Sequence, residues 1–181
     1  MIHLLIQALW LSLPLLVGGA LHMVVVKLDL WPRLRKPISK RLFGSNKTWR
    51  GFVVMPLATV PGVWLVQHFT APSAPPHFPP GLGAGTFLGL ALGLAYALFE
   101  LPNSGLKRRM GIAPGKRARG AWAPAFVLLD QADSALGCMV VYRLALDTPW
   151  AVMAVCLVLG PAVHLVGNLT LFSLGLRKEP T

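Results

Sequence analysis

The sequence predicts an all-α integral membrane protein with about five transmembrane helices, and composition and charge are the first observations that indicate it. Of 181 residues, 55% are hydrophobic and only 13% are charged, with a mean hydropathy of +0.62. The net charge is nevertheless +11, from 17 Lys and Arg against 6 Asp and Glu. A nucleic-acid-binding domain of this charge, or a disordered chain, would contain many more charged residues. Basic residues confined to short loops between membrane helices explain both values.

Five apolar segments are long enough to cross the hydrocarbon core of a bilayer, which requires about 20 helical residues. They span residues 2–26, 52–69, 83–101, 122–146 and 150–176. We expect one transmembrane domain over residues 1–181, with cytoplasmic loops at 27–51 and 102–121. The segment TAPSAPPHFPPG, residues 70–81, is too rich in proline to be helical and contains no Lys, Arg, Asp or Glu, so we expect an external loop.

The basic residues are distributed very unevenly among the connections. Eight lie between Lys27 and Arg50, six between Lys107 and Arg119, and two after the fifth segment, whereas Arg143 alone lies near the fourth connection. Alternate connections lie on the same side of a membrane, so 16 of the 17 basic residues share one face. The positive-inside rule makes that face cytoplasmic. We therefore expect the N-terminus outside and the C-terminus in the cytoplasm, in a multi-pass protein of the cell membrane.

Glycines recur at every fourth position of the third segment. Gly81, Gly85, Gly89 and Gly93 would lie on one face of a helix. Small residues at this spacing allow two membrane helices to approach closely. We favour such a helix contact over a ligand-binding role for these glycines.

Asp130 and Asp133 lie three residues apart in the fourth segment, so a helix places both carboxylates on one face, beside Ser134. A charged side chain inside a bilayer costs about 2.5 to 3.5 kcal/mol by insertion scales, so another interaction must compensate. One explanation is a buried ion pair or a protonated carboxyl group. The other is coordination of a divalent metal in a cavity open to the cytoplasm, which we favour because a structural ion pair requires only one acid.

Two basic motifs face the same compartment as this cavity. FGSNKTWRG, residues 43–51, places Lys47, Thr48 and Arg50 just before the second helix. ELPNSGLKRRMGIAPG, residues 100–115, contributes Glu100, Asn103, Ser104, Lys107, Arg108 and Arg109. Arg and Lys donors with backbone N–H groups suit phosphate oxygens. Charge alone is equally consistent with an anchor on anionic lipid headgroups, but the Asn, Ser and Gly residues and the carboxylate pair favour phosphate binding.

A metal site with clustered cations is suited to phosphoryl or nucleotidyl transfer. The membrane location implies that one substrate is a lipid. The chain contains neither a Walker motif GxxxxGK[ST] nor a Gly-rich dinucleotide-binding fingerprint, so we expect no separate nucleotide domain.

Three motifs resemble a known family when they are taken together. KTWRG at residues 47–51, SxxKRRxGIxPG at 104–115 and LDQxD at 129–133 are similar to the CDP-archaeol synthase family, membrane cytidylyltransferases related to the CDP-diacylglycerol synthases. The motifs occur in the family's order. Where archaeal members tend to read GDLxKSF, this chain has FELPNSG at residues 99–105, a form that resembles bacterial members.

The resemblance implies a Mg²⁺-dependent condensation of CTP with a lipid phosphate, either phosphatidic acid or an ether-lipid analogue. The products would be a CDP-lipid for phospholipid biosynthesis and pyrophosphate. We expect the catalytic residues to be Asp130, Asp133, Lys107 and Arg108, with both aspartates as metal ligands. The expected substrate-binding residues are Lys47, Thr48, Arg50, Glu100, Asn103, Ser104 and Arg109, with Glu100 supporting the metal site or pairing with a cation. Membrane lipids are expected partners, and nucleic acid is not.

Two alternatives to this enzyme stay open from the sequence. One is a non-catalytic membrane protein that binds anionic lipid, and the other is a lipid kinase or phosphatase, which would not release pyrophosphate from CTP. In the fifth segment, His164 and Asn168 lie four residues apart. We favour interhelical hydrogen bonding for this pair over a place in a lipid pocket.

Overall fold

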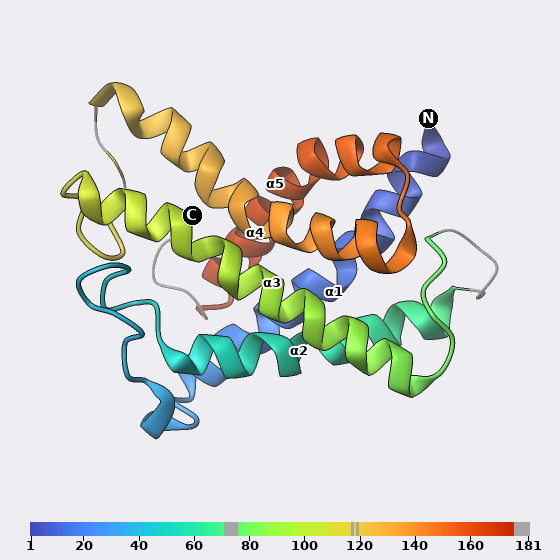
Figure 1. Cartoon of the computed structure of the whole chain (residues 1–181), viewed down its shortest axis with the longest axis horizontal. Coiled ribbons are helices and arrows are strands. Elements are labelled where there is room, and N and C mark those ends of the chain that lie inside the picture. The colour runs from blue at the N-terminus through green and yellow to red at the C-terminus, as the bar shows by residue number, and fades with distance from the viewer. Residues whose placement is uncertain (71–75, 117, 119, 176–181) are drawn as a thin grey trace.

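Five long α-helices make up most of the protein in a computed structural model that describes residues 1–70, 76–116, 118 and 120–175, apart from the side chains of Gln131 and His164. The helices are α1 (Ile2–Lys27), α2 (Trp49–Phe69), α3 (Leu82–Arg109), α4 (Ala123–Leu146) and α5 (Trp150–Ser173) (Figure 1). Two 3₁₀ turns, η1 (Pro32–Leu34) and η2 (Gly120–Trp122), lie in the connections.

The prediction of an all-α membrane protein is confirmed. Each of the five helices is long and apolar enough to cross a bilayer. Within the described ranges, the only β-type pairing is an isolated bridge between Pro37 and Thr48. The predicted segments agree with the helices to within three residues, except at the end of α3. Which side of the membrane each end faces stays a prediction.

The helices contact one another in a closed ring. α1 packs against α2 and α5, α2 against α3, α3 against α4, and α4 against α5. Figure 1 shows the α1–α2 and α3–α4 connections at the same end of the molecule. The two connections that carry most of the basic residues therefore lie together, as the alternation of helix directions requires.

Glycines allow α3 to approach α2 closely. A Cβ atom at Gly89 would lie 2.6 Å from the Cα atom of Val60, so any side chain there would separate the two helices. Gly93 makes the same kind of contact with the α2 backbone at Met55 and Pro56, and Gly85 lies against the Gln67 side chain of α2. Gly81 precedes α3 and has open space around it. The predicted helix contact is confirmed for three of the four glycines.

The connection predicted at 102–121 begins as helix, because α3 continues to Arg109. Pro102 indicated a helix end, since proline lacks an N–H group and disfavours the helix interior. In membrane helices, neighbouring groups compensate for the missing bond. Here Asn103 and Lys107 stabilise the extension by donating hydrogen bonds to α4. The start of the second basic motif is therefore helical.

The α1–α2 connection folds back on itself just before α2. The backbone N–H of Ile38 donates to the carbonyl oxygen of Lys47 at 2.9 Å, and that of Trp49 donates to the carbonyl oxygen of Lys36 at 3.1 Å. One bond uses the carbonyl group of Lys47 and the other the N–H group of Trp49, so together they anchor the backbone at Lys47. They therefore fix the direction in which its side chain leaves the connection.

Candidate active site

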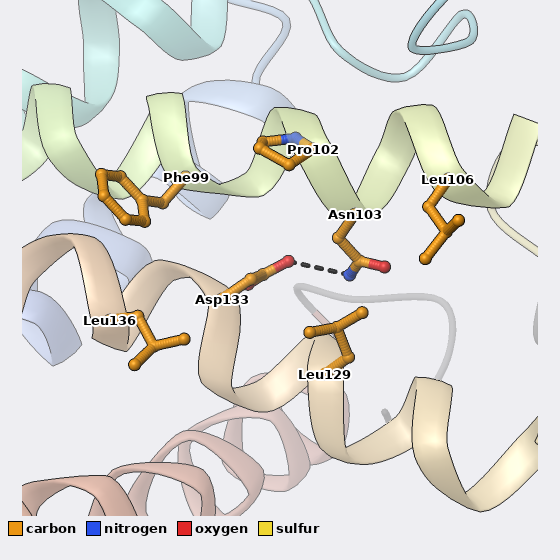
Figure 2. A pocket seen from close by; sticks show the side chains of 7 residues that line it. All are labelled: Phe99, Pro102, Asn103, Leu106, Leu129, Asp133 and Leu136. Carbon is orange, nitrogen blue, oxygen red and sulfur yellow. Dashed lines mark hydrogen bonds between the residues drawn. The ribbon is translucent and has the colours of Figure 1, made fainter.

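Asn103 lies at the centre of a polar cluster between α3 and α4. Its amide nitrogen donates to Asp130 Oδ1 at 2.6 Å and to Asp133 Oδ2 at 2.8 Å, and Figure 2 shows the second of these bonds. Asn103 and Asp133 are only 6% and 8% exposed. The two aspartates share one face of α4 because they are three residues apart. The predicted carboxylate pair is thus held together by a neutral amide from the facing helix.

Lys107, one helical turn after Asn103, neutralises Asp130. Its ammonium nitrogen lies 2.5 Å from each oxygen of that carboxylate, and 5.7 Å from the centre of the Phe126 ring. The four-residue spacing puts Asn103 and Lys107 on the same face of α3. Four predicted site residues, two from each helix, therefore form one hydrogen-bonded network.

Lys47 and Glu100 form a second ion pair, between the α1–α2 connection and α3. Their side chains are 21% and 26% exposed, so water still reaches the pair. Asp133 lies within electrostatic range of both residues, and so does His22 of α1. Glu100 lies three residues before Asn103 on α3, so the second pair lies about one helical turn from the Asn103 network.

Arg108 lies where the two basic connections meet. Gly44 has a φ of +88°, and a Cβ atom there would lie 2.7 Å from a guanidinium nitrogen of Arg108 and 2.8 Å from the side chain of Pro114. Glycine suits both the conformation and the close approach. The Nε atom of Arg108 is buried and has no hydrogen-bond partner among the described residues. Because a buried donor without a partner is unfavourable, this guanidinium group is suited to an anionic ligand.

Arg50 is bound at a different place. It is 6% exposed and donates to Asp29 Oδ1 at 2.8 Å and to the carbonyl oxygen of Leu30 at 3.3 Å. Arg35 donates to the other oxygen of Asp29 at 2.9 Å. The guanidinium group of Arg50 therefore ties the residues that follow α1 to the first turn of α2.

Three further predicted site residues do not take part in the hydrogen-bonded network. Thr48 precedes the first residue of α2 and makes no side-chain cap bond, Ser104 is half-buried on α3, and Arg109 is exposed at its end. In α5, Asn168 is 5% exposed, so it is buried as an interhelical residue would be. The side chain of His164 lies outside the described residues.

The residues present fit a magnesium ion. The described part of the chain contains no group of three or more His, Cys, Asp or Glu that could hold a metal. Mg²⁺ usually takes only one or two protein carboxylates together with substrate phosphates, so Asp130 and Asp133 are sufficient. In addition, Oδ1 of Asn103 is buried without a hydrogen-bond partner in the described ranges. Figure 2 shows this oxygen on the side of the amide that faces away from Asp133, so it could accept a hydrogen bond from a ligand on that side.

Comparison with known proteins identifies the family. The profile of the CarS-like family, described as CDP-archaeol synthase, matches residues 1–180. The chain belongs to this family. The CDP-archaeol synthase of Halorubrum lacusprofundi is 36% identical over 147 residues, which cover 77% of each chain. That of Thermofilum pendens is 36% identical over 142 residues, covering 78% of this chain and 60% of the relative. No solved structure gives a significant match.

A CDP-archaeol synthase of Halobacterium salinarum is also similar, at 33% identity over 151 residues, or 78% of this chain and 77% of the relative. The family expected from the three motifs is thereby confirmed. Because the family profile covers nearly the whole chain, the resemblance is not limited to the motifs.

Sequence reasoning missed two contributions to the polar region of this family member. Asp29, the partner of Arg50, was one of the few acids in the chain, and its place among basic residues was an available signal. Tyr96 of α3 is the second, and it lies within electrostatic range of Glu100 and Asp133. Its position seven residues before Asn103 puts it on the same helical face, which was the signal for its place near the site.

Proposed function

We propose that this member of the CDP-archaeol synthase family transfers CMP from CTP to the phosphate of a membrane lipid, giving a CDP-lipid and pyrophosphate. The observation that carries the proposal is the network in which Asn103 and Lys107 of α3 bind Asp130 and Asp133 of α4. Membership of the family makes the chain a cytidylyltransferase. It favours this activity over a non-catalytic lipid-binding role and over a lipid kinase or phosphatase.

Three cations would bind the triphosphate and the lipid phosphate. Lys47 and Lys107 are each held by a carboxylate, from Glu100 and Asp130. Arg108 presents a buried Nε that has no partner in the described part of the chain. Phosphate oxygens can replace the carboxylates as partners of the lysines, and they can accept from the fork of the arginine.

Asp130 and Asp133 would hold Mg²⁺. When bound, the ion supplies positive charge that polarises the phosphoryl group and lowers the repulsion between the two substrates. Movement of Lys107 from Asp130 to a phosphate would free both oxygens of that carboxylate. The hydrogen bonds from Asn103 would keep the two aspartates on the same side of the site during this exchange.

The reaction proceeds by direct displacement at phosphorus. An oxygen of the lipid phosphate forms a bond to the α-phosphorus of CTP, and the bond from that phosphorus to the oxygen of the β-phosphate breaks, so that pyrophosphate leaves. Lys107 and Arg108 stabilise the negative charge on the transferred and departing groups. No covalent enzyme intermediate is required.

Both substrates would meet at the cytoplasmic face of the cell membrane. The positive-inside rule places the two basic connections there, since they lie at the same end of the helix bundle (Figure 1). CTP would reach the site from the cytoplasm, whereas the lipid would reach it within the membrane.

Purified protein with CTP, Mg²⁺ and vesicles containing a lipid phosphate tests the proposal. We expect a CDP-lipid and one pyrophosphate per turnover. A phosphorylated lipid with release of CDP would instead indicate a kinase, and no reaction with any phosphatidic acid or ether-linked analogue would overturn the proposed function.

A further inference from the structure

A cavity of about 250 Å³ lies between α3 and α4, directly beside the bond from Asn103 to Asp133 (Figure 2). Apart from those two residues its lining is apolar, and consists of Phe99, Pro102, Leu106, Leu129 and Leu136. This apolar cavity lies between two membrane-spanning helices, next to the groups proposed to bind phosphate. It therefore suits the part of a lipid's hydrocarbon chain that is nearest the lipid phosphate.

The helix directions determine which residues such a chain must pass. α3 ends at the basic connections, so Leu106 lies on the side of the cations and Phe99 lies deeper in the membrane span. Figure 2 shows Phe99 and Leu136 together on one side of Asp133, with Leu106 on the opposite side of Asn103. A lipid whose phosphate lies near Asn103 would therefore extend its chains along Phe99 and Leu136.

The position of the Phe99 ring is fixed by the backbone of α4. A Cβ atom at Gly137 would lie 2.6 Å from Cγ of Phe99 and 2.8 Å from the carbonyl oxygen of Ala95. The ring therefore lies against a bare stretch of helix backbone, where it cannot move further toward α4. Because Phe99 is still 40% exposed, its free edge borders the cavity and limits its width.

We infer that Phe99 determines which hydrocarbon chains are accepted, favouring lipid phosphates with straight chains over those with methyl branches near the glycerol. This inference rests on the proposed function. The cavity is smaller than a typical small-molecule site of roughly 300 to 1,000 Å³, so it admits only the first part of a chain. A methyl branch in that part would meet the rigid ring of Phe99, whereas an unbranched chain would pass it.

The test compares two lipid phosphates that have the same linkage to glycerol and differ only in methyl branching. The kcat/KM ratio of straight to branched substrate is measured for wild type, Phe99→Leu and Phe99→Ala. Discrimination by an apolar pocket is about 10- to 200-fold per methylene-sized group. We therefore expect the ratio to decrease by about tenfold or more in Phe99→Ala and by less in Phe99→Leu. Leu98→Ala is the matched control, since Leu98 is 44% exposed and does not line the cavity.

Each outcome has a defined meaning. An unchanged ratio in an active Phe99 variant, or a wild-type preference for the branched substrate, overturns the role of Phe99 and leaves the proposed function intact. Absence of CDP-lipid from both substrates in the wild type overturns the proposed function itself. If Phe99→Ala does not fold, Phe99→Leu decides, because leucine preserves an apolar contact with α4.

Discussion

The ammonium nitrogen of Lys107 lies 2.5 Å from each carboxylate oxygen of Asp130, so an expected phosphate ligand and an expected metal ligand neutralise each other. An isolated charge at this depth is unfavourable, and the pair stays compensated until substrates replace it. Asp133 has different partners, since it accepts only from the amide of Asn103 and the backbone N–H of Ser134 among the described residues. The two aspartates should therefore respond differently to substitution.

Asp133→Asn should reduce turnover by about 10²-fold or more, which is the usual effect of removing one group that stabilises transition-state charge. The protein should remain folded, because an amide keeps the shape of the side chain and can still accept from Asn103. CDP-lipid formation and elution from a sizing column in detergent measure the two properties. The control is Asp147→Asn, at the other end of α4, where Asp147 is exposed and pairs with Arg143. Wild-type turnover of Asp133→Asn would contradict the assignment of the metal site.

Lys107→Gln should have opposite effects on metal binding and on activity. Removal of the ammonium group frees both oxygens of Asp130, so Mn²⁺, used as a paramagnetic substitute for Mg²⁺, should bind more tightly without nucleotide. Turnover should nevertheless decrease by about 10²-fold, because a cation for the transferred phosphate is lost. Titration of free Mn²⁺ by electron paramagnetic resonance and an activity assay measure the two effects. Weaker Mn²⁺ binding in Lys107→Gln would exclude competition between the two cations for Asp130.

Arg108→Lys should lower kcat/KM by about tenfold or more, since lysine lacks the planar fork that binds two phosphate oxygens and lacks the buried Nε. Arg109→Lys is the matched control, because Arg109 is exposed at the end of α3. A protein that only uses its basic residues to attract anionic lipid would tolerate both substitutions equally. Steady-state kinetics with CTP as the varied substrate distinguishes these results.

Arg50→Lys should chiefly reduce stability, because Arg50 is buried and bound to Asp29 and the carbonyl oxygen of Leu30. We expect a loss of about 1 to 2 kcal/mol, since Asp29 is partly exposed and water screens the pair. Thermal unfolding in detergent measures the loss, and Asp29→Asn should reproduce it. A large increase in the KM for CTP at unchanged melting temperature would instead place Arg50 at the nucleotide.

Much of the candidate site could be predicted because its residue types are rare in an apolar chain. Asp130 and Asp133 were conspicuous as acids in a membrane segment, and the basic motifs next to them were equally visible. The extension of α3 through Pro102 could not be predicted, since its stability depends on hydrogen bonds to a helix about 25 residues later in the sequence. For the same reason, the sequence could not show that Arg50 pairs with Asp29 whereas Lys47 pairs with Glu100.

The sequence by itself determined the class of protein, five membrane helices, the family and the residue types of the site. These properties follow from hydropathy, periodicity and local motifs, which are all short-range features of the chain. Only the tertiary structure decided the pairings: Asn103 with both aspartates, Lys107 with Asp130, Lys47 with Glu100, and Arg50 with Asp29. Tertiary packing selected these pairs by fixing which face of α3 meets α4, and how the α1–α2 connection lies against α3 and the first turn of α2.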